Sequence, residues 1–299
     1  MSQMPALSLA AVPGRRKATL ELAQQIEQRG FSGIFCPSMG DGLALCEALA
    51  LVTNEIVFGT SITPIYFRSV NDFAQTASFI HEVSAGRFRF GIGVSHAPAL
   101  EQRGISFGKP LEDTRKFVDE IVEVQRAGEL PPIILATLRK KMIALSEEIG
   151  AGMVFANGCR SHMKESLAVL SDDSRTGDFF IGDMIPTCID DDIEAAKAVN
   201  RRTLSGYALM PNYRNYWKEA GYVSEMEGIE EAIAARDMAK IPTLLSDEWL
   251  ADTTLFGPAR RVREELDKWF DAGVKTPILV PSSADGGQMK AFEELFGIF

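Results

Sequence analysis

The sequence predicts a single domain with a (β/α)8 barrel fold over residues 1–299. Short apolar segments alternate with segments of helical spacing, as in a parallel sheet covered by helices. The pattern repeats eight times, and eight such units in 299 residues match the size of a (β/α)8 barrel. No low-complexity tract or Pro/Gly/Ser-rich linker divides the chain. An open doubly wound sheet is the alternative that this count leaves open.

The apolar segments define eight expected strands in chain order. They cover residues 6–11, 33–38, 56–62, 88–94, 131–137, 152–158, 179–188 and 276–282. Between them, apolar residues three or four positions apart predict helices, several of which stop at a glycine such as Gly30, Gly150 or Gly273. A longer helical region, about residues 191–246, is expected as an insertion between the seventh and eighth strands.

Composition narrows the class of protein. The formal net charge of -10 argues against a general nucleic-acid binder, because phosphate backbones require a basic surface. No apolar run approaches the length of a membrane span, and the N-terminal segment lacks the basic region of a signal peptide. We therefore expect a cytoplasmic protein without membrane contacts. The four cysteines have no CxxC spacing, so free buried thiols are expected and no metal site is predicted.

The segment "GRFRFGIGVSHA", residues 86–97, ends its apolar run in Gly91-Ile92-Gly93. A dinucleotide-binding fingerprint would need a third glycine where His96 stands, and it would follow the first strand rather than the fourth. In a barrel, both glycines lie at the carboxyl end of a strand, where active sites are found. There they would let a flat ring or a backbone segment approach closely. The alternative is that small residues merely fit the inside of the barrel.

Five segments, in this order, resemble a known family. They read "GFSGIF", "VFGTSITPIYFRS", "FIHEVSAGRFRFGIGVS", "ALEQRGISFGKP" and "PPIILATLRKKMIALSEEIGAGMVFANG". Together they resemble the luciferase-like monooxygenase superfamily, and most closely its branch that uses the deazaflavin coenzyme F420, which includes the methylenetetrahydromethanopterin reductases. The most specific segment is "SAGRFRFGIG", where the family has "SGGR" followed by a strand and G-x-G.

The resemblance implies a (β/α)8 barrel that binds a flavin or deazaflavin at the carboxyl ends of its strands. The family has a bulge with a non-prolyl cis peptide bond in the third strand, against which the cofactor ring rests. The cis bond is expected here between Ser61 and Ile62. The cofactor-binding residues that the resemblance implies on the third and fourth strands are Thr60, Ser61, Ile62, Thr63, Gly91, Gly93, Val94 and Ser95.

The resemblance places the cofactor phosphate at the loop before the fifth helix. A helix N-terminus offers free N–H groups and the positive end of a dipole to such an anion. The residues expected there are Ala136, Thr137, Leu138, Arg139 and Lys140, and Asn157 is expected to contact the cofactor after the sixth strand. Relatives often have glycine and proline in this loop. The alternative is a solvated basic start of a helix.

His96 is the predicted catalytic residue. A histidine at the end of the fourth strand could donate a proton or orient the ring, and relatives of the reductase type commonly have an aspartate there. The alternative is a hydrogen-bonded loop histidine without a role in the reaction.

The substrate side departs from the family. Pro37-Ser38-Met39 replaces an acid and a histidine, and Ala10 stands about where reductases have a glutamate. The residues expected to contact substrate are Cys36, Ser38, Met39, Tyr66 and Arg68.

Three functions remain open from the sequence. The first is an F420-dependent oxidoreductase that moves a hydride between the deazaflavin and a small organic substrate, since in such enzymes the cofactor carries the reactive carbon. The second is an FMN-dependent monooxygenase of the same fold. The third is a barrel that binds a flavin or deazaflavin without catalysis. The resemblance also implies a homodimer, formed through the helices that follow the second and third strands.

Overall fold

The computed structural model describes residues 3–106 and 108–299. The chain divides into two compact units, here called unit 1 and unit 2. Unit 1 consists of Met1–Phe155 and Val169–Gly182, and unit 2 of Ala156–Ala168 and Asp183–Phe299.

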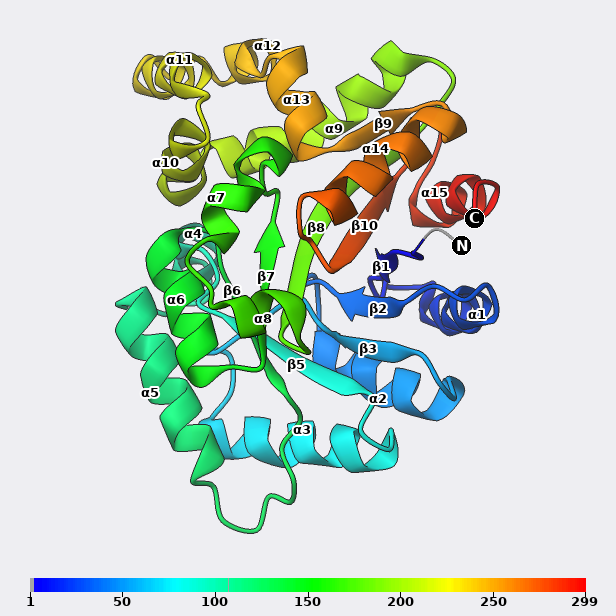
Figure 1. Cartoon of the computed structure of the whole chain (residues 1–299), viewed down its shortest axis with the longest axis vertical. Coiled ribbons are helices and arrows are strands. Elements are labelled where there is room, and N and C mark those ends of the chain that lie inside the picture. The colour runs from blue at the N-terminus through cyan, green and yellow to red at the C-terminus, as the bar shows by residue number, and fades with distance from the viewer. Residues whose placement is uncertain (1–2, 107) are drawn as a thin grey trace. The chain divides into compact units, whose positions relative to one another are not determined.

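Strands and helices alternate through unit 1, which runs from blue to green in Figure 1. Its elements are β1 (Ala6–Ser8), α1 (Arg16–Gln28), β2 (Gly33–Cys36), α2 (Gly42–Val52), β3 (Val57–Thr60), β4 (Thr63–Pro64), α3 (Val70–Val83), β5 (Phe88–Gly93), α4 (Ala97–Glu101), α5 (Pro110–Val122), β6 (Ile133–Ala136), α6 (Lys140–Ile149), β7 (Gly152–Ala156) and α8 (Asp172–Thr176). Successive strands pair in parallel, for example with Leu7 opposite Ile34 and Phe90 opposite Ile133.

The strands of unit 1 are apolar because both of their faces are covered. All four residues of β2 are buried, and so are Phe88 and Phe90 of β5. The helices bury one stripe each, as α5 does with Thr114, Phe117 and Ile121 at spacings of three and four residues. Neighbouring helices pack in order, α1 on α2, α2 on α3, α3 on α5 and α5 on α6.

Arg87, in the segment "SAGR", forms hydrogen bonds to the end of α2, the start of β3 and the end of α3. Its Nε donates to the Ser84 carbonyl at 2.9 Å. Its Nη1 donates to Thr53 Oγ1 at 2.8 Å and to the Ile56 carbonyl at 3.1 Å. Its Nη2 donates to the carbonyls of Ala50 and Thr53 at 3.1 and 3.0 Å. Carbonyl groups at the end of a helix lack partners inside the helix, so this guanidinium stabilises the end of α2. The arginine of the segment that carries the family resemblance most specifically is therefore structural.

Unit 2 contains a helical region and three strands. Its elements are η1 (Arg160–His162), α7 (Met163–Leu167), β8 (Phe180–Ile189, from Asp183 onward), α9 (Ile193–Ala208), α10 (Pro211–Glu219), α11 (Val223–Ala234), η2 (Met238–Lys240), α12 (Ile241–Leu244), α13 (Asp247–Thr253), β9 (Leu255–Gly257), α14 (Ala259–Asp271), β10 (Thr276–Ser282) and α15 (Gln288–Phe296). Strand β9 pairs in parallel with the end of β8, with Thr187 opposite Leu255.

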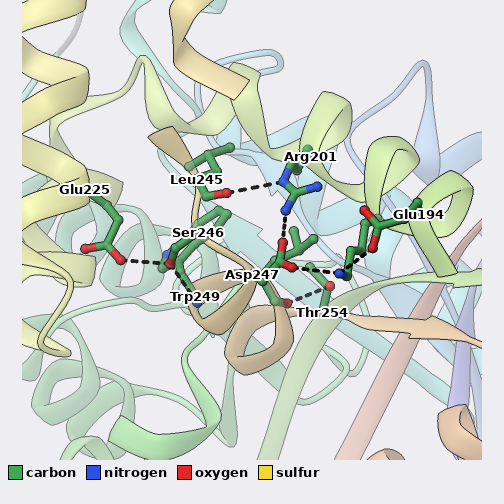
Figure 2. A network of polar contacts seen from close by, with 10 residues as sticks. Glu194, Arg201, Glu225, Leu245, Ser246, Asp247, Trp249 and Thr254 are labelled. Carbon is green, nitrogen blue, oxygen red and sulfur yellow. Dashed lines mark hydrogen bonds and ion pairs between the residues drawn. The ribbon is translucent and has the colours of Figure 1, made fainter. Parts of the chain in front are cut away.

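The start of α13 is held by a polar network (Figure 2). Asp247 accepts from Lys197 at 2.7 Å and also pairs with Arg201, both on α9. The hydrogen bond from Lys197 is the largest of the effects that lower the pKa of Asp247. Ser246 caps α13 by accepting from the Trp249 amide at 3.1 Å. Because Asp247 is more than half exposed, solvent screens these ion pairs, and their main effect is to fix the position of the helix.

The predicted (β/α)8 barrel is confirmed. All eight expected strands are present, and their order β10-β1-β2-β3-β5-β6-β7-β8, with a further pairing between β10 and β8, closes the sheet. The helical insertion between the seventh and eighth strands is also present, as α9 to α13. No helix among residues 3–106 and 108–299 is long and apolar enough to cross a membrane.

Three details differ from the prediction. The third strand is interrupted and continues as β4, α4 lies where a loop was expected, and the three-residue strand β9 was not predicted. Strand β9 and helix α4 are too short to show a periodicity in sequence.

Candidate cofactor site

The third strand carries a bulge where the resemblance implied one. Gly59 lies opposite Arg89, and Thr63 lies opposite Ile92. The chain therefore takes four steps from Gly59 to Thr63 while β5 takes three, so β3 and β4 hold one extra residue. The peptide bond between Ser61 and Ile62 is cis, as predicted. The Ser61 amide donates to the Cys36 carbonyl at 2.7 Å, which anchors the bulge to the end of β2.

The bulge lies directly against Gly91. The Thr60 hydroxyl donates to the Gly91 carbonyl at 2.6 Å. A Cβ on Gly91 would lie 1.9 Å from the Thr60 carbonyl oxygen, and a Cβ on Gly93 would lie 2.9 Å from the Ala136 Cβ. The two glycines therefore give clearance to the protein's own third strand and to the end of β6. A backbone segment approaches Gly91, as expected, whereas side chains approach Gly93.

The loop after β6 leads into a helix whose first turn has no side-chain cap. Arg139 occupies the N-cap position without such a hydrogen bond, Lys140 begins α6, and both side chains are exposed. Thr137 is buried, and its amide donates to the Val154 carbonyl at 2.9 Å. Leu138, between Thr137 and Arg139, is half-buried. Uncapped N–H groups with basic side chains nearby are suited to an anionic group.

Three buried hydroxyls in unit 1 have no hydrogen-bond partner among the described residues: Thr114 Oγ1 lies on α5, and the other two follow strands. These two are Ser61 Oγ on the bulge and Thr137 Oγ1 after β6. Strand β5 pairs with both β4 and β6, so the two hydroxyls come from strands on either side of it. Buried polar groups are nearly always paired, and a polar ligand would supply the missing partners. These residues fit a cofactor that carries a polar ring and an anionic tail.

His96 lies just beyond β5, where it forms the N-cap of α4. Val94 and Ser95 precede it, and Ser95 has a positive φ of 62°. The imidazole is half-buried, and burial lowers the pKa of His96 below its usual value. It is therefore mostly neutral at pH 7, when one ring nitrogen donates and the other accepts. A neutral imidazole can hold or pass a proton, but it does not supply a fixed positive charge.

The residues expected at the substrate lie in different surroundings. Cys36 is buried, with its Sγ 3.7 Å from Cys46 Sγ, whereas Ser38 and Met39 are exposed. The Tyr66 hydroxyl donates to Asp113, and Arg68 pairs with Asp41, each at 2.6 Å. Asp41 and Asp113 were not predicted, because nothing in the local sequence marks them as partners.

Asn157 belongs to unit 2, where it is buried with a positive φ of 59°. Its amide donates to the Met184 carbonyl, and its carbonyl accepts from Trp217 Nε1, each at 3.1 Å. Its predicted contact with the cofactor stays a sequence prediction. Next to it, the Gly158 amide donates to Asp183 Oδ1 at 3.3 Å. Burial raises the pKa of this fully buried carboxyl, so the protonated acid is favoured.

Several known proteins are similar to this chain. A proposed coenzyme F420-dependent oxidoreductase of Mycobacterium tuberculosis is 24% identical over an alignment that covers 89% of this chain and 91% of the relative. A 5,10-methylenetetrahydromethanopterin reductase of Methanolobus tindarius is 29% identical over an alignment that covers 44% of this chain and 48% of that enzyme.

Solved structures share the fold. The coenzyme F420-dependent tetrahydromethanopterin reductase of Methanopyrus kandleri superposes with a TM-score of 0.76 at 16% identity, over 98% of this chain and 97% of that one. The FMN complex of a type II Baeyer-Villiger monooxygenase of Pseudomonas putida has a TM-score of 0.59 at 15% identity, over 98% and 97% of the two chains. The family model of luciferase-like monooxygenases matches residues 6–276. The chain therefore belongs to the luciferase-like monooxygenase family.

Proposed function

We propose that this protein is an F420-dependent oxidoreductase that transfers a hydride between the deazaflavin and a small organic substrate. The observation that carries the proposal is the pair of buried, unpartnered hydroxyls of Ser61 and Thr137 in unit 1. The F420-dependent relative of Mycobacterium tuberculosis named above supports the deazaflavin over other cofactors. When bound, the deazaflavin would supply the carbon that accepts or gives the hydride.

Two regions of unit 1 would bind two different parts of the cofactor. The bulge would support the ring through Ser61 and Ile62, and the basic start of α6 would receive the anionic tail through Arg139 and Lys140. The other proposed contacts line the same strand ends: Thr60, Thr63, Gly91, Gly93, Val94, Ser95, Ala136, Thr137 and Leu138.

His96 is the proposed catalytic residue in this arrangement. Its half-buried, neutral imidazole would accept the proton that a hydroxyl-type substrate loses when it gives up a hydride, and return that proton to the carbonyl oxygen in the reverse direction, or it would orient the substrate by a hydrogen bond. No acidic side chain takes this role at the end of β2, where Ser38 and Met39 stand. The chemistry of the protein therefore relies on orientation and shielding more than on fixed charges.

An FMN-dependent monooxygenase is the second candidate, since an FMN complex shares the fold. A titration separates the candidates: F420 and FMN are added in turn to the purified protein while fluorescence and thermal stability are followed. F420 at 100 times its dissociation constant should stabilise the protein by about 2.7 kcal/mol. Tight FMN binding with oxygen consumption would favour the second candidate. Binding without turnover over a substrate panel would favour a non-catalytic protein, and no response to either cofactor would overturn the first two functions.

A further inference from the structure

Tyr66 ties the bulged strand to the start of α5. It follows β4 by two residues, and its hydroxyl donates to Asp113 Oδ2 at 2.6 Å in the first turn of α5. The Gly108 amide in turn donates to the Tyr66 oxygen. A Cβ on Gly108 would lie 1.8 Å from Asp113 Oδ2, so Gly108 leaves room for this contact. Burial, followed by the hydrogen bond to Asp113, raises the pKa of Tyr66, which keeps the hydroxyl a donor at ordinary pH.

Phe67, the residue after Tyr66, contacts the turn that follows α4. The Arg103 guanidinium lies over the Phe67 ring, 4.2 Å from its centroid, within the range of a cation–π contact. The amides of Arg103 and Ile105 both donate to the Leu100 carbonyl, so the turn that carries Arg103 is continuous with α4. Leu100 is fully buried, which anchors α4 in unit 1.

His96 directly precedes α4, the helix whose following turn contacts Phe67. The amides of Ala99 and Leu100 donate to the His96 carbonyl at 3.0 and 3.1 Å, so the position of α4 fixes the backbone of His96. Ser95, immediately before it, has a positive φ, so the chain changes direction there after β5. The backbone of His96 is therefore held by β5 on one side and by α4 on the other, and the turn after α4 carries the contact of Arg103 to Phe67.

We propose that Tyr66 and Phe67 are positioning residues that hold His96 at the carboxyl end of β5. The hydroxyl of Tyr66 and the ring of Phe67 are both engaged with protein groups, so their role is to fix the connection from β5 to α5 and not to contact substrate. The consequence for turnover rests on the proposed function. The positioning itself is a property of the free protein and can be measured without a cofactor.

The test is an NMR titration of the histidine ring protons in the cofactor-free protein. The chain has three histidines, so His81 and His162 serve as internal references. Tyr66→Phe removes the hydroxyl and keeps the ring. We expect the pKa of His96 to rise in this variant toward about 6.5, the value of a hydrated histidine. Arg115→Gln is the matched control, because it removes an exposed ion pair to Glu148 from the same helix α5 and leaves Tyr66 intact.

A His96 pKa that stays at its wild-type value in Tyr66→Phe, despite a lower melting temperature, would overturn the proposal. If Tyr66→Phe does not fold, Asp113→Asn gives the same test, because it weakens the acceptor of Tyr66 at constant size. In turnover with F420, Tyr66→Phe should lower kcat roughly ten-fold, since small misplacements of a catalytic group are costly, and leave the F420 dissociation constant within about two-fold. A wild-type protein that binds neither cofactor would contradict the proposed function and leave the histidine titration valid.

Discussion

The Thr60 carbonyl oxygen occupies the space where a side chain of residue 91 would begin, 1.9 Å from the Cβ position of Gly91, while the Thr60 hydroxyl donates to the Gly91 carbonyl at 2.6 Å. The two residues are 31 positions apart in sequence. Their contact shows that the glycine at residue 91 makes room for the bulge of the third strand. Packing within unit 1 is therefore sufficient to explain the glycine at residue 91 of the "GIG" segment.

Gly91→Ala should therefore destabilise the protein strongly. The added methyl group would meet a backbone atom that cannot rotate away, so we expect a loss of about 3 kcal/mol or more in the free energy of unfolding. Urea denaturation followed by circular dichroism measures this loss. Gly206→Ala is the control: Gly206 lies in α9 with no atom within 4 Å of its Cβ position, and the change should be neutral or stabilise by up to about 1 kcal/mol. Equal stability of Gly91→Ala and wild type would contradict the packing explanation.

Ser61→Ala and Thr137→Val should separate ligand binding from stability. Both hydroxyls are buried without a partner in the part of the chain that the structure describes, so their removal should leave the cofactor-free protein as stable as before, or up to about 1 kcal/mol more stable. The F420 dissociation constant should rise about ten-fold for each variant, corresponding to about 1.4 kcal/mol of lost hydrogen bonding. Thermal melts and fluorescence titration give the two quantities. Unchanged F420 affinity in both variants would exclude these hydroxyls as ligand contacts.

Arg87→Lys should be costly although it preserves the charge. The guanidinium reaches five acceptors from Ala50 to Ser84, and a lysine ammonium has neither the donors nor the planar shape to replace it. We expect a loss of about 2 to 4 kcal/mol in the free energy of unfolding. Arg89→Lys is the control, because Arg89 Nη1 donates to the carbonyls of Gly86 and Phe88 in its own segment, and it should cost less than about 1 kcal/mol. Similar losses for the two arginines would contradict the bracing role.

Asp183 should make the stability of the protein depend on pH. Its pKa is raised in the folded protein by burial, so the folded state binds the proton more tightly than the unfolded state. The contribution of this group is fully present below the unfolded pKa of about 3.9 and is lost as the pH rises through the folded pKa. Relative to Asp183→Asn, which does not titrate, wild type should lose up to about 1.4 kcal/mol per pH unit over that range.

Denaturation of wild type and Asp183→Asn at several pH values from about 4.5 upward measures this difference, starting just above the unfolded pKa. A difference between the two proteins that stays constant over the whole range would show that Asp183 is ionised in the fold.

Local pattern was enough to predict most of the architecture. The apolar runs correspond to all eight strands of the barrel, because strands covered on both faces must be apolar along their length. The position of the cis bond at Ser61–Ile62 and the helical insertion were also predicted, the first from resemblance and the second from helical spacing. The strand β9 was missed, because three residues carry no readable period.

The sequence by itself determined the order of the eight barrel strands, the bulge and the family, because burial periodicity and short motifs are properties of neighbouring residues. Only the tertiary structure decided the partners of Arg87, the hydrogen bond from Tyr66 to Asp113 and the contact of Asp183 with Gly158. Tyr66 and Asp113 are 47 residues apart, and a hydrogen bond at that separation exists only when two elements of the fold bring its atoms within about 3 Å. Side-chain partners of this kind decide which polar residues remain available for a ligand.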